Sequence, residues 1–169
     1  MPEVILVDPQ SDWPDRFRIE AERLLKLLSG SVRSIEHVGS TAVPGLPAKP
    51  TIDMMGDSPC VAVAEACVPS LEAAGYAYVP DVDKDWPDRR FFHRSEGTDR
   101  LFQLHLVPRA SRFWNDYLRF RNALRENPDH VRDYANLKER LAAEFRDDVA
   151  GYTRAKSDFV RHVLRSGAA

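Results

Sequence analysis

Residues 36–55 carry the feature that most limits how this chain can fold. The segment reads EHVGSTAVPGLPAKPTIDMM and places a Gly-Ser-Thr turn and a proline-rich loop between two short apolar runs. Residues 34–38 and 51–55 have the composition of strands, and the Gly and Pro residues between them are typical of turns and loops. We therefore expect two short strands that pair across this loop.

The rest of the first 108 residues mixes helix and strand patterns. A helix is expected from Ser11 or Asp12 to about residue 30, and a second over residues 60–74, which Pro69 should kink or restart. A weak strand over 76–79 precedes an acidic loop. Residues 90–94 and 101–107 are typical of a hairpin around Ser95-Glu96-Gly97-Thr98, and strand 101–107 should lie near strand 51–55.

The composition changes after Pro108. Residues 111–127, 128–146 and 147–166 alternate apolar and charged residues at helical spacing, so we predict three helices over 109–169. The predicted fold is α/β (α+β): a mixed sheet with flanking helices over residues 1–108, followed by the three-helix segment. A chain of 169 residues matches one domain, 1–169.

The charge balance limits the partners. Charged residues make up 30% of the chain, hydrophobic residues make up 43%, and the formal net charge is -2. No excess of positive charge favours non-specific binding to nucleic acid or to a membrane. An anionic ligand must therefore be met by basic residues gathered at one place.

The cysteines and the N-terminus bear on the compartment. Cys60 and Cys67 are the only cysteines, and on one helix they would stand about 10 Å apart along the axis, too far for a disulfide. The first residues lack a basic region followed by a long apolar run, and no later segment is apolar for long enough to span a bilayer. We therefore expect a soluble, cytoplasmic protein.

The Gly-Ser-Thr turn is a candidate anion site. A strand that leads into Gly39-Ser40-Thr41 exposes backbone N–H groups and two hydroxyls, and Gly39 permits a close approach. Lys49 lies on the same loop, so its ammonium could reach an anion at the turn. The alternative is that Gly and Ser only form a tight turn.

Asp53 is the second chemical feature of the segment. Strand alternation places Asp53 and Met55 on one face and Ile52 and Met54 on the other, so the carboxylate stands in otherwise apolar sequence. A carboxylate there needs a partner. It could accept structural hydrogen bonds, or it could hold a hard cation such as Mg²⁺ beside a phosphate.

These residues carry a family resemblance. Gly39-Ser40, twelve intervening residues and Asp53 are similar to the nucleotidyltransferase-superfamily signature, in which a Gly-Ser or Gly-Gly turn precedes an aspartate-containing strand. The segment more closely resembles the GrpB family, whose pattern is His, Ile or Val, Gly-Ser-Thr, Pro-Gly, Lys-Pro and Ile-Asp. The similarity continues in LEAAGY (71–76), RRFF (89–92), LHLV (104–107), YANLK (134–138) and YTRAK (152–156).

The resemblance implies a nucleotidyltransferase-like fold in which Asp53 would be the catalytic carboxylate. Active nucleotidyltransferases usually carry a second carboxylate two residues later, where this chain has Met55, so that two metal ions can be held. Their third carboxylate would fall on the 101–107 strand, which carries Gln103 and His105. GrpB relatives commonly read His-Leu-His there, so Gln103 also departs from the closer pattern.

A one-metal site is an alternative. His37, Asp53 and His105 offer imidazole and carboxylate ligands that suit Zn²⁺ or Mn²⁺, whereas Asp53 beside a phosphate suits Mg²⁺. A lone strand histidine is more often a hydrogen-bonded structural residue than a metal ligand.

Further basic residues could complete a phosphate site. Arg90, next to Arg89, could form a fork to a phosphate, or both arginines could balance the acidic residues of 81–88. Related folds use a C-terminal helical lysine to steady phosphates, which suggests Lys156 first and Lys138 second. Each of these lysines follows a tyrosine by four residues, so tyrosine packing under a lysine stem is the structural alternative.

Three functional hypotheses follow. The chain binds a nucleotide or another phosphate-containing small molecule, which could be a coenzyme A precursor because GrpB-like domains can be joined to a dephospho-coenzyme A kinase. Alternatively, it is a metal-dependent nucleotidyltransferase or phosphotransferase, which Met55 argues against. Thirdly, it is a structural or partner-binding protein whose helical tail is the interface.

Overall fold

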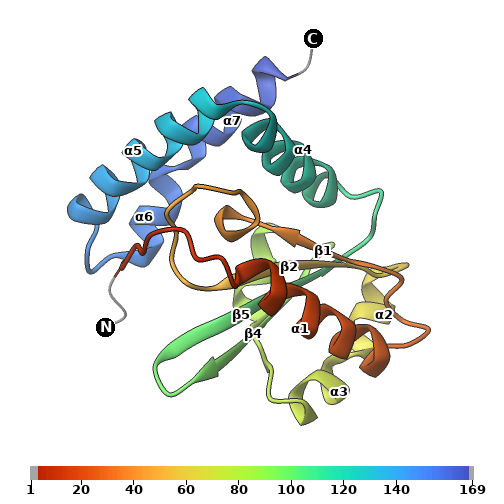
Figure 1. Ribbon diagram of the computed structural model, residues 1–169. Helices are drawn as coiled ribbons and strands as arrows, with labels where there is room; N and C mark the ends of the chain where they lie inside the picture. Colours follow the sequence, from red (N-terminus) through yellow and green to blue (C-terminus); the bar gives the residue numbers. More distant parts are fainter. Residues whose placement is uncertain (1–3, 168–169) are drawn as a thin grey trace.

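A computed structural model describes residues 4–167 of the chain. Its centre is a five-stranded sheet in the order β1-β2-β5-β4-β3, with helices on both faces (Figure 1). The strands are β1 (Ile35–Val38), β2 (Ile52–Asp57), β3 (Ala77–Tyr78), β4 (Arg90–Glu96) and β5 (Asp99–Val107). The predicted mixed sheet with flanking helices is confirmed.

The two strands predicted from residues 36–55 pair as expected. β1 and β2 are antiparallel, with Val38 opposite Asp53 and His37 opposite Met54. β2 and β5 are parallel, with Asp53 opposite Gln103 and Met55 opposite His105. Directly opposed residues share a face of a sheet, so Asp53, Met55, Gln103 and His105 all lie on one face.

The predicted hairpin is also present and is longer than expected. β4 and β5 are antiparallel from Arg90 opposite Leu106 to Glu96 opposite Asp99, with an irregularity at Arg94 and Ser95. The turn is therefore tighter than predicted, since only Gly97 and Thr98 separate the strands. Gly97 has a φ of 57°, which is readily adopted by glycine.

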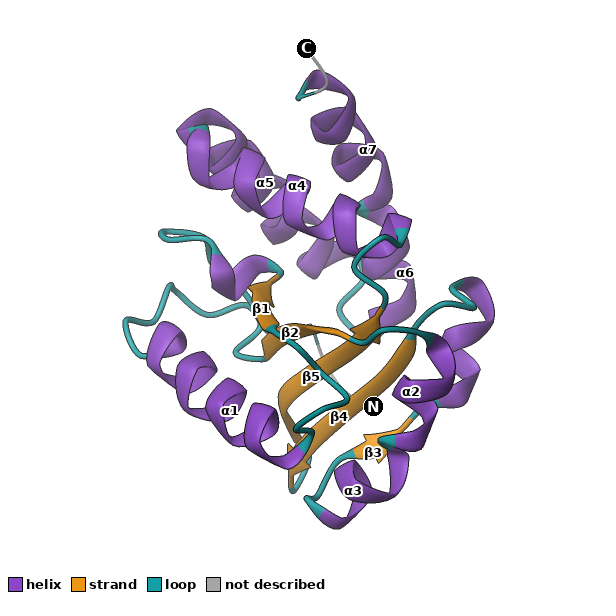
Figure 2. Cartoon of the chain, turned by 90° about the vertical axis from the view of Figure 1, so that its right-hand side faces the viewer, coloured by secondary structure: helices purple, strands orange, loops and turns teal. Residues whose placement is uncertain are grey.

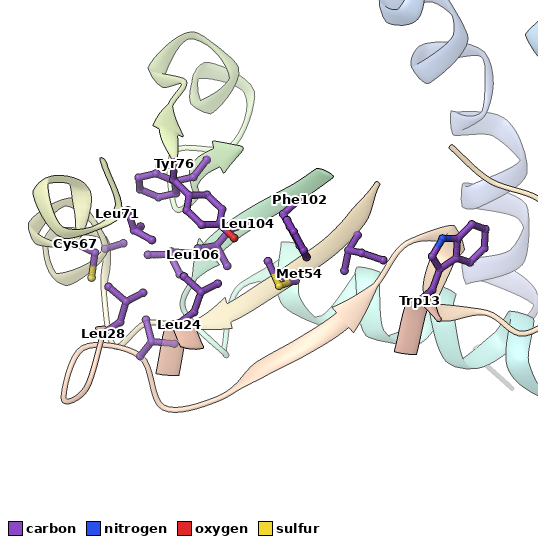
Figure 3. Packing of buried hydrophobic residues seen from close by; sticks show 14 of the residues in the cluster. Trp13, Leu24, Leu28, Met54, Cys67, Leu71, Tyr76, Phe102, Leu104 and Leu106 are labelled. Atoms are coloured by element: carbon purple, nitrogen blue, oxygen red, sulfur yellow. The ribbon is translucent and has the colours of Figure 1, made fainter. Parts of the chain in front are cut away.

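Three helices cover one face of the sheet: α1 (Trp13–Leu27), α2 (Val61–Ala66) and α3 (Val68–Ala73). Figure 3 shows Leu24 and Leu28 of the α1 segment and Leu71 of α3 against Met54, Leu104 and Leu106 of the strands. The predicted helix over 60–74 restarts at Cys67, because Pro69 in the first turn of α3 has no N–H to continue the preceding helix.

The C-terminal helices lie beyond the opposite face (Figure 2). They are α4 (Arg112–Glu126), α5 (Pro128–Glu144), α6 (Val149–Ala155) and α7 (Ser157–Ser166). Ser111 and Asn127 cap α4 and α5 through side-chain oxygens. Phe113 and Trp114 of α4 pack with Val38 and Met55, which covers this face of the sheet.

The prediction of three helices after Pro108 is wrong, because the structure divides the last of them, residues 147–166, into α6 and α7. The helix breaks at Lys156, whose backbone still has αR angles (φ −78°, ψ −14°). Tyr152 of α6 packs with Val4 and Leu141, whereas Phe159 of α7 packs with Leu124. The two halves therefore bury side chains in different clusters, a division that helical spacing alone does not reveal.

Within residues 4–167, no helix combines the length and the apolar character needed to cross a bilayer.

Candidate anion-binding site

The sheet face under α4 carries Asp53 at the start of β2. Asp53 Oδ1 accepts a hydrogen bond of 2.8 Å from the Gln103 amide nitrogen, while the amide oxygen of Gln103 accepts from Arg100 at 3.3 Å. Gln103, which departs from the family pattern, therefore satisfies one carboxylate oxygen by hydrogen bonding and leaves the charge of Asp53 unchanged. It does not supply a further carboxylate or imidazole.

Gly39 touches the other oxygen of this carboxylate. A Cβ added at Gly39 would lie 2.5 Å from Asp53 Oδ2, and Gly39 itself has a φ of 72° and a ψ of −170°. This is a backbone region that essentially only glycine occupies. The glycine is therefore needed both for the turn and for the approach of Asp53.

Three lysines from separate elements act on the charge of Asp53. Lys49 comes from the proline-rich loop, Lys138 from α5 and Lys156 from the junction of α6 and α7. Lys138 is only 1% exposed and donates to the Pro47 carbonyl, two residues before Lys49. Lys49 and Lys156 are half-buried. We call these three lysines and Asp53 the lysine–aspartate cluster.

The lysine–aspartate cluster is partly desolvated, and burial is the main cause of the pKa shifts of its members. Burial lowers the pKa of Lys138 to about 7, repulsion from Lys156 adds to this, and Asp53 opposes it. Burial and repulsion from Lys49 lower the pKa of Lys156 to about 8. Burial raises the pKa of Asp53 to about 6, although Lys49 and Lys156 act in the opposite direction. A second anion would stabilise the charged lysines.

The Tyr-Lys spacing noted in the sequence has a structural counterpart. Lys138 Nζ lies 5.2 Å from the centre of the Tyr134 ring, and Lys156 Nζ lies 4.1 Å from the centre of the Tyr152 ring. The tyrosines thus pack against the lysines, as the structural alternative predicts. They also help to hold both ammonium groups at the cluster, so the two interpretations are compatible.

The side chains of Ser40 and Thr41 in the turn interact with different residues. Ser40, in the short 3₁₀ segment η1 (Ser40–Ala42), lies close enough to Tyr134 to oppose the rise in the pKa of that tyrosine. Thr41 is buried, and its hydroxyl lies 2.9 Å from His37 Nε2. The Thr41 hydroxyl is therefore engaged in the protein, which leaves its backbone N–H as the group it could offer to a ligand.

His37 is not brought together with Asp53 and His105. It pairs with Met54, on the opposite face of the sheet, and its ring stacks on Phe17 of α1 with centroids 4.7 Å apart. Burial, with repulsion from Arg125 and Arg121, lowers the pKa of His37 to about 4. A site built from His37, Asp53 and His105 is therefore not assembled.

His105 shares the face of Asp53 but stands among aromatic rings. Its ring centroid lies 4.9 Å from that of Phe91, 5.1 Å from that of Phe113 and 5.9 Å from that of Tyr117. Burial, with repulsion from Arg89, lowers the pKa of His105 to about 3. It is a neutral member of the layer under α4.

Arg90 lies away from the cluster. It pairs with Leu106 on the face covered by α1–α3, and its guanidinium bonds Glu65 of α2 at 2.5 Å and 3.1 Å. Its neighbour Arg89 points to the other face and packs over the rings of Phe91 and Phe113. Arg89 directly precedes β4 and Arg90 is its first residue, so the extended backbone turns the two side chains to opposite faces and Arg90 is not brought to the site.

The cluster by itself is a poor fit for a divalent cation. Residues 4–167 contain no group of three or more His, Cys, Asp or Glu side chains placed to hold a metal ion. Asp53 supplies the only carboxylate of the cluster, and the surrounding lysines would repel a cation. Oxygens of a bound phosphate would have to supply most of the ligands of any metal held there.

Comparison with known proteins places the chain in a family. The family described as GrpB protein matches residues 3–166. The chain belongs to the GrpB family. The crystal structure of the conserved GrpB protein from Enterococcus faecalis is 29% identical, has a TM-score of 0.86 and is covered over 96% of both chains. The resemblance read from the Gly-Ser-Thr segment is thereby confirmed.

Several GrpB relatives are known from sequence. A UPF0157 protein of Pseudomonas aeruginosa is 38% identical over 165 residues, which cover 96% of this chain and 66% of the relative. The glutamate-rich protein GrpB of Alkalihalophilus pseudofirmus is 32% identical, over 96% of this chain and 94% of its own length. A dephospho-CoA kinase of Mycolicibacterium paratuberculosis is 27% identical over 96% of this chain and 45% of the kinase.

Sequence reasoning underestimated two residues of the site. Lys138 ranked second to Lys156, yet it is the most buried of the three lysines. Tyr134 packs against Lys138, as the Tyr-Lys spacing predicts, and Ser40 also acts on this tyrosine by opposing the rise in its pKa. The repeated Tyr-Lys spacing was the available signal, but it could not show that α5 and α6 deliver their lysines to one carboxylate.

Proposed function

We propose that this GrpB protein binds a nucleotide or another phosphate-containing small molecule at the lysine–aspartate cluster. One observation carries the proposal: Lys49, Lys138 and Lys156 come from three separate parts of the chain and all act on the charge of Asp53, and Lys138 is tied to the loop of Lys49 through the Pro47 carbonyl. Lysine is a common point-charge ligand of phosphate.

The energetics of the free protein support this assignment. Keeping Lys138 and Lys156 close together and partly desolvated is costly, which is why their pKa values fall. An anion bound between them would offset that cost. Gly39 borders the same carboxylate, and the N–H groups of Gly39 and of Ser40 and Thr41, which follow it in the turn, are the backbone donors that such an anion would use.

The similarity to a dephospho-CoA kinase suggests which phosphate-containing compound to test as the ligand. A dephospho-CoA kinase contains a region similar to this chain, which makes a coenzyme A precursor a reasonable candidate. Dephospho-CoA combines a nucleotide with a diphosphate, so it also belongs to the class that the lysines favour. It should be tested beside simple nucleotides.

The alternative proposal is metal-dependent nucleotidyl or phosphoryl transfer. It would use Asp53 to hold a cation, with the phosphate oxygens as further ligands. Met55 is fully buried in the layer under α4 and Gln103 bonds Asp53, so neither position adds a carboxylate. These two residues favour binding over transfer, since a two-metal clamp needs paired carboxylates.

Isothermal titration of the full chain tests the proposal. AMP, ATP and dephospho-CoA are titrated with and without Mg²⁺ into the unmodified protein, Lys156→Gln and Lys26→Gln, the last removing one exposed charge from α1 on the other side of the sheet. We expect binding that Lys156→Gln weakens about tenfold or more and Lys26→Gln leaves unchanged. At 100 times Kd, such a ligand raises the unfolding free energy by about 2.7 kcal/mol. Equal affinity in all three proteins would contradict the proposed site.

A further inference from the structure

We infer that the lysine–aspartate cluster selects a group that carries two negative charges on one phosphate or on a diphosphate, and discriminates against monoanions such as phosphodiesters and carboxylates. This inference rests on the proposed function and specifies its ligand class. It follows from the charges that face the cluster and from the way each of them is fixed.

The cluster contains more basic than acidic side chains. Lys49, Lys138 and Lys156 supply three positive charges when protonated, and Asp53 removes one, which leaves two to be balanced. The tyrosines that border the cluster stay neutral, because burial raises the pKa of Tyr117 and of Tyr152 to about 12 and raises that of Tyr134 further. Arg100 also lowers the pKa of Asp53, and its guanidinium donates to the amide oxygen of Gln103. Its side chain is exposed, so solvent screens its charge, and it is not counted among the two.

Three histidines lie on or near this face and do not change the count. His93 stands opposite Gln103, and burial lowers its pKa below the usual value. Burial keeps the pKa values of His37 and His105 well below neutrality. They are therefore uncharged where the lysines are ionised, and the balance of two positive charges holds around neutral pH once an anion has restored the lysines to their charged forms.

The positions of the donors are set by the protein. Lys138 is 1% exposed, and its bond to the Pro47 carbonyl commits one of its three N–H groups. Asp53 is fixed between Gln103 and Gly39, so it cannot rotate away from an incoming anion. The half-buried Lys49 and Lys156 are the accessible members, so the anion approaches from their side.

A monoanion leaves this arrangement unsatisfied. A phosphodiester or a carboxylate would balance one lysine, and a second desolvated ammonium would stay without a counter-charge beside Asp53. A phosphomonoester, a terminal phosphate or a diphosphate brings both charges within one compact group. The backbone of a nucleic acid, with one charge on each diester, fits less well than a small phosphorylated metabolite.

Pairs of ligands of similar size and different charge separate the effect of charge on affinity from that of size. Methyl phosphate and dimethyl phosphate are titrated at pH 8, where the monoester is a dianion, and AMP and cyclic 3′,5′-AMP repeat the comparison with a nucleoside attached. We expect the monoester of each pair to bind about tenfold or more tightly. Lys156→Gln should reduce this preference, as should Lys49→Gln if the first variant folds poorly, whereas Lys26→Gln should keep it.

Proton uptake gives an independent readout. Titrations of methyl phosphate at pH 8 in two buffers with different ionisation enthalpies measure protons taken up, and we expect uptake because bound phosphate restores protons to Lys138 and Lys156. Equal affinity for monoester and diester, or no uptake, overturns the inference and leaves the proposed function standing. Failure of every phosphate compound to bind overturns the proposed function itself.

Discussion

Gly39 stands so close to Asp53 that a methyl group on its Cα would lie 2.5 Å from Asp53 Oδ2. No Cβ is tolerated at that distance without movement of the turn or of the carboxylate. The contact joins the two motifs that first drew attention in the sequence, because the turn after β1 is shaped to receive the side chain of β2.

Gly39→Ala should therefore destabilise the protein more than alanine at a comparable glycine. Gly45 also has a positive φ, 77°, but a Cβ there meets nothing within 4 Å. We expect a loss of about 1 kcal/mol for Gly45→Ala and about 3 kcal/mol for Gly39→Ala, measured by urea unfolding. Asp53→Ala should recover part of the Gly39→Ala loss in a double-mutant cycle, and full additivity of the two losses would show that the contact is unimportant.

The buried lysines should make stability depend on pH. The folded-state pKa of Lys138 is about 7 and that of Lys156 about 8, both lowered from 10.5. Above these values the unfolded chain holds protons that the folded lysines have lost, so stability rises with pH, by up to about 1.4 kcal/mol per unit for each lysine. Urea unfolding at pH 7, 8 and 9 without phosphate should show this rise.

Lys138→Met tests whether Lys138 contributes to this rise of stability with pH, since methionine keeps an unbranched side chain and removes the charge. The slope between pH 7 and 9 should fall in this variant, and the protein should be more stable than the parent at pH 7. A slope equal to that of the parent would mean that Lys138 does not titrate in this range. Lys26→Gln provides the control for loss of an exposed charge.

Thr41→Val should affect stability and leave ligand binding nearly unchanged. The variant removes the hydroxyl that lies 2.9 Å from His37 Nε2 and leaves a buried imidazole nitrogen without this partner. We expect a loss of about 1–3 kcal/mol in urea unfolding, with methyl phosphate affinity within about twofold. A large drop in affinity with unchanged stability would place the Thr41 hydroxyl at the ligand instead.

Asp53→Asn separates binding from metal-dependent transfer. Without Mg²⁺, the variant should bind methyl phosphate and AMP several-fold more tightly, because a negative charge beside the anion is removed. With Mg²⁺ present, Asp53→Asn should still bind these ligands more tightly than the unmodified protein does. If Mg²⁺ strengthens binding only while Asp53 is present, and the unmodified protein releases pyrophosphate from ATP in an Asp53-dependent reaction, the transferase alternative replaces the binding proposal.

Much of the site was readable from residues 36–55 because strand geometry is local. A strand has a period of two, so the sequence alone placed Asp53 and Met55 on one face. The Gly-Ser-Thr turn between two apolar runs predicted that β1 and β2 would pair, and they do. The family resemblance was equally accessible, since it depends on an ordered series of short motifs along the chain.

Other features depended on register and packing between distant segments. Pairing of His37 with Met54 puts His37 on the far face of the sheet, and pairing of Arg90 with Leu106 does the same for Arg90. Sequence spacing does not specify which residues of two strands stand opposite each other. The expected grouping of these residues with Asp53 therefore could not be checked until the strands were aligned.

What the sequence determined by itself is the set of elements, the Gly-Ser-Thr turn and the placement of Asp53 on its strand, because short-range sterics and hydrophobic periodicity decide these. The tertiary structure alone decided that Lys138 and Lys156 meet Lys49 at this carboxylate. Residues 85 or more positions from Asp53 reach it only because α5 and α6 bury their apolar faces in particular clusters. Burial is a property of the packed chain, and so are the lowered pKa values of those two lysines.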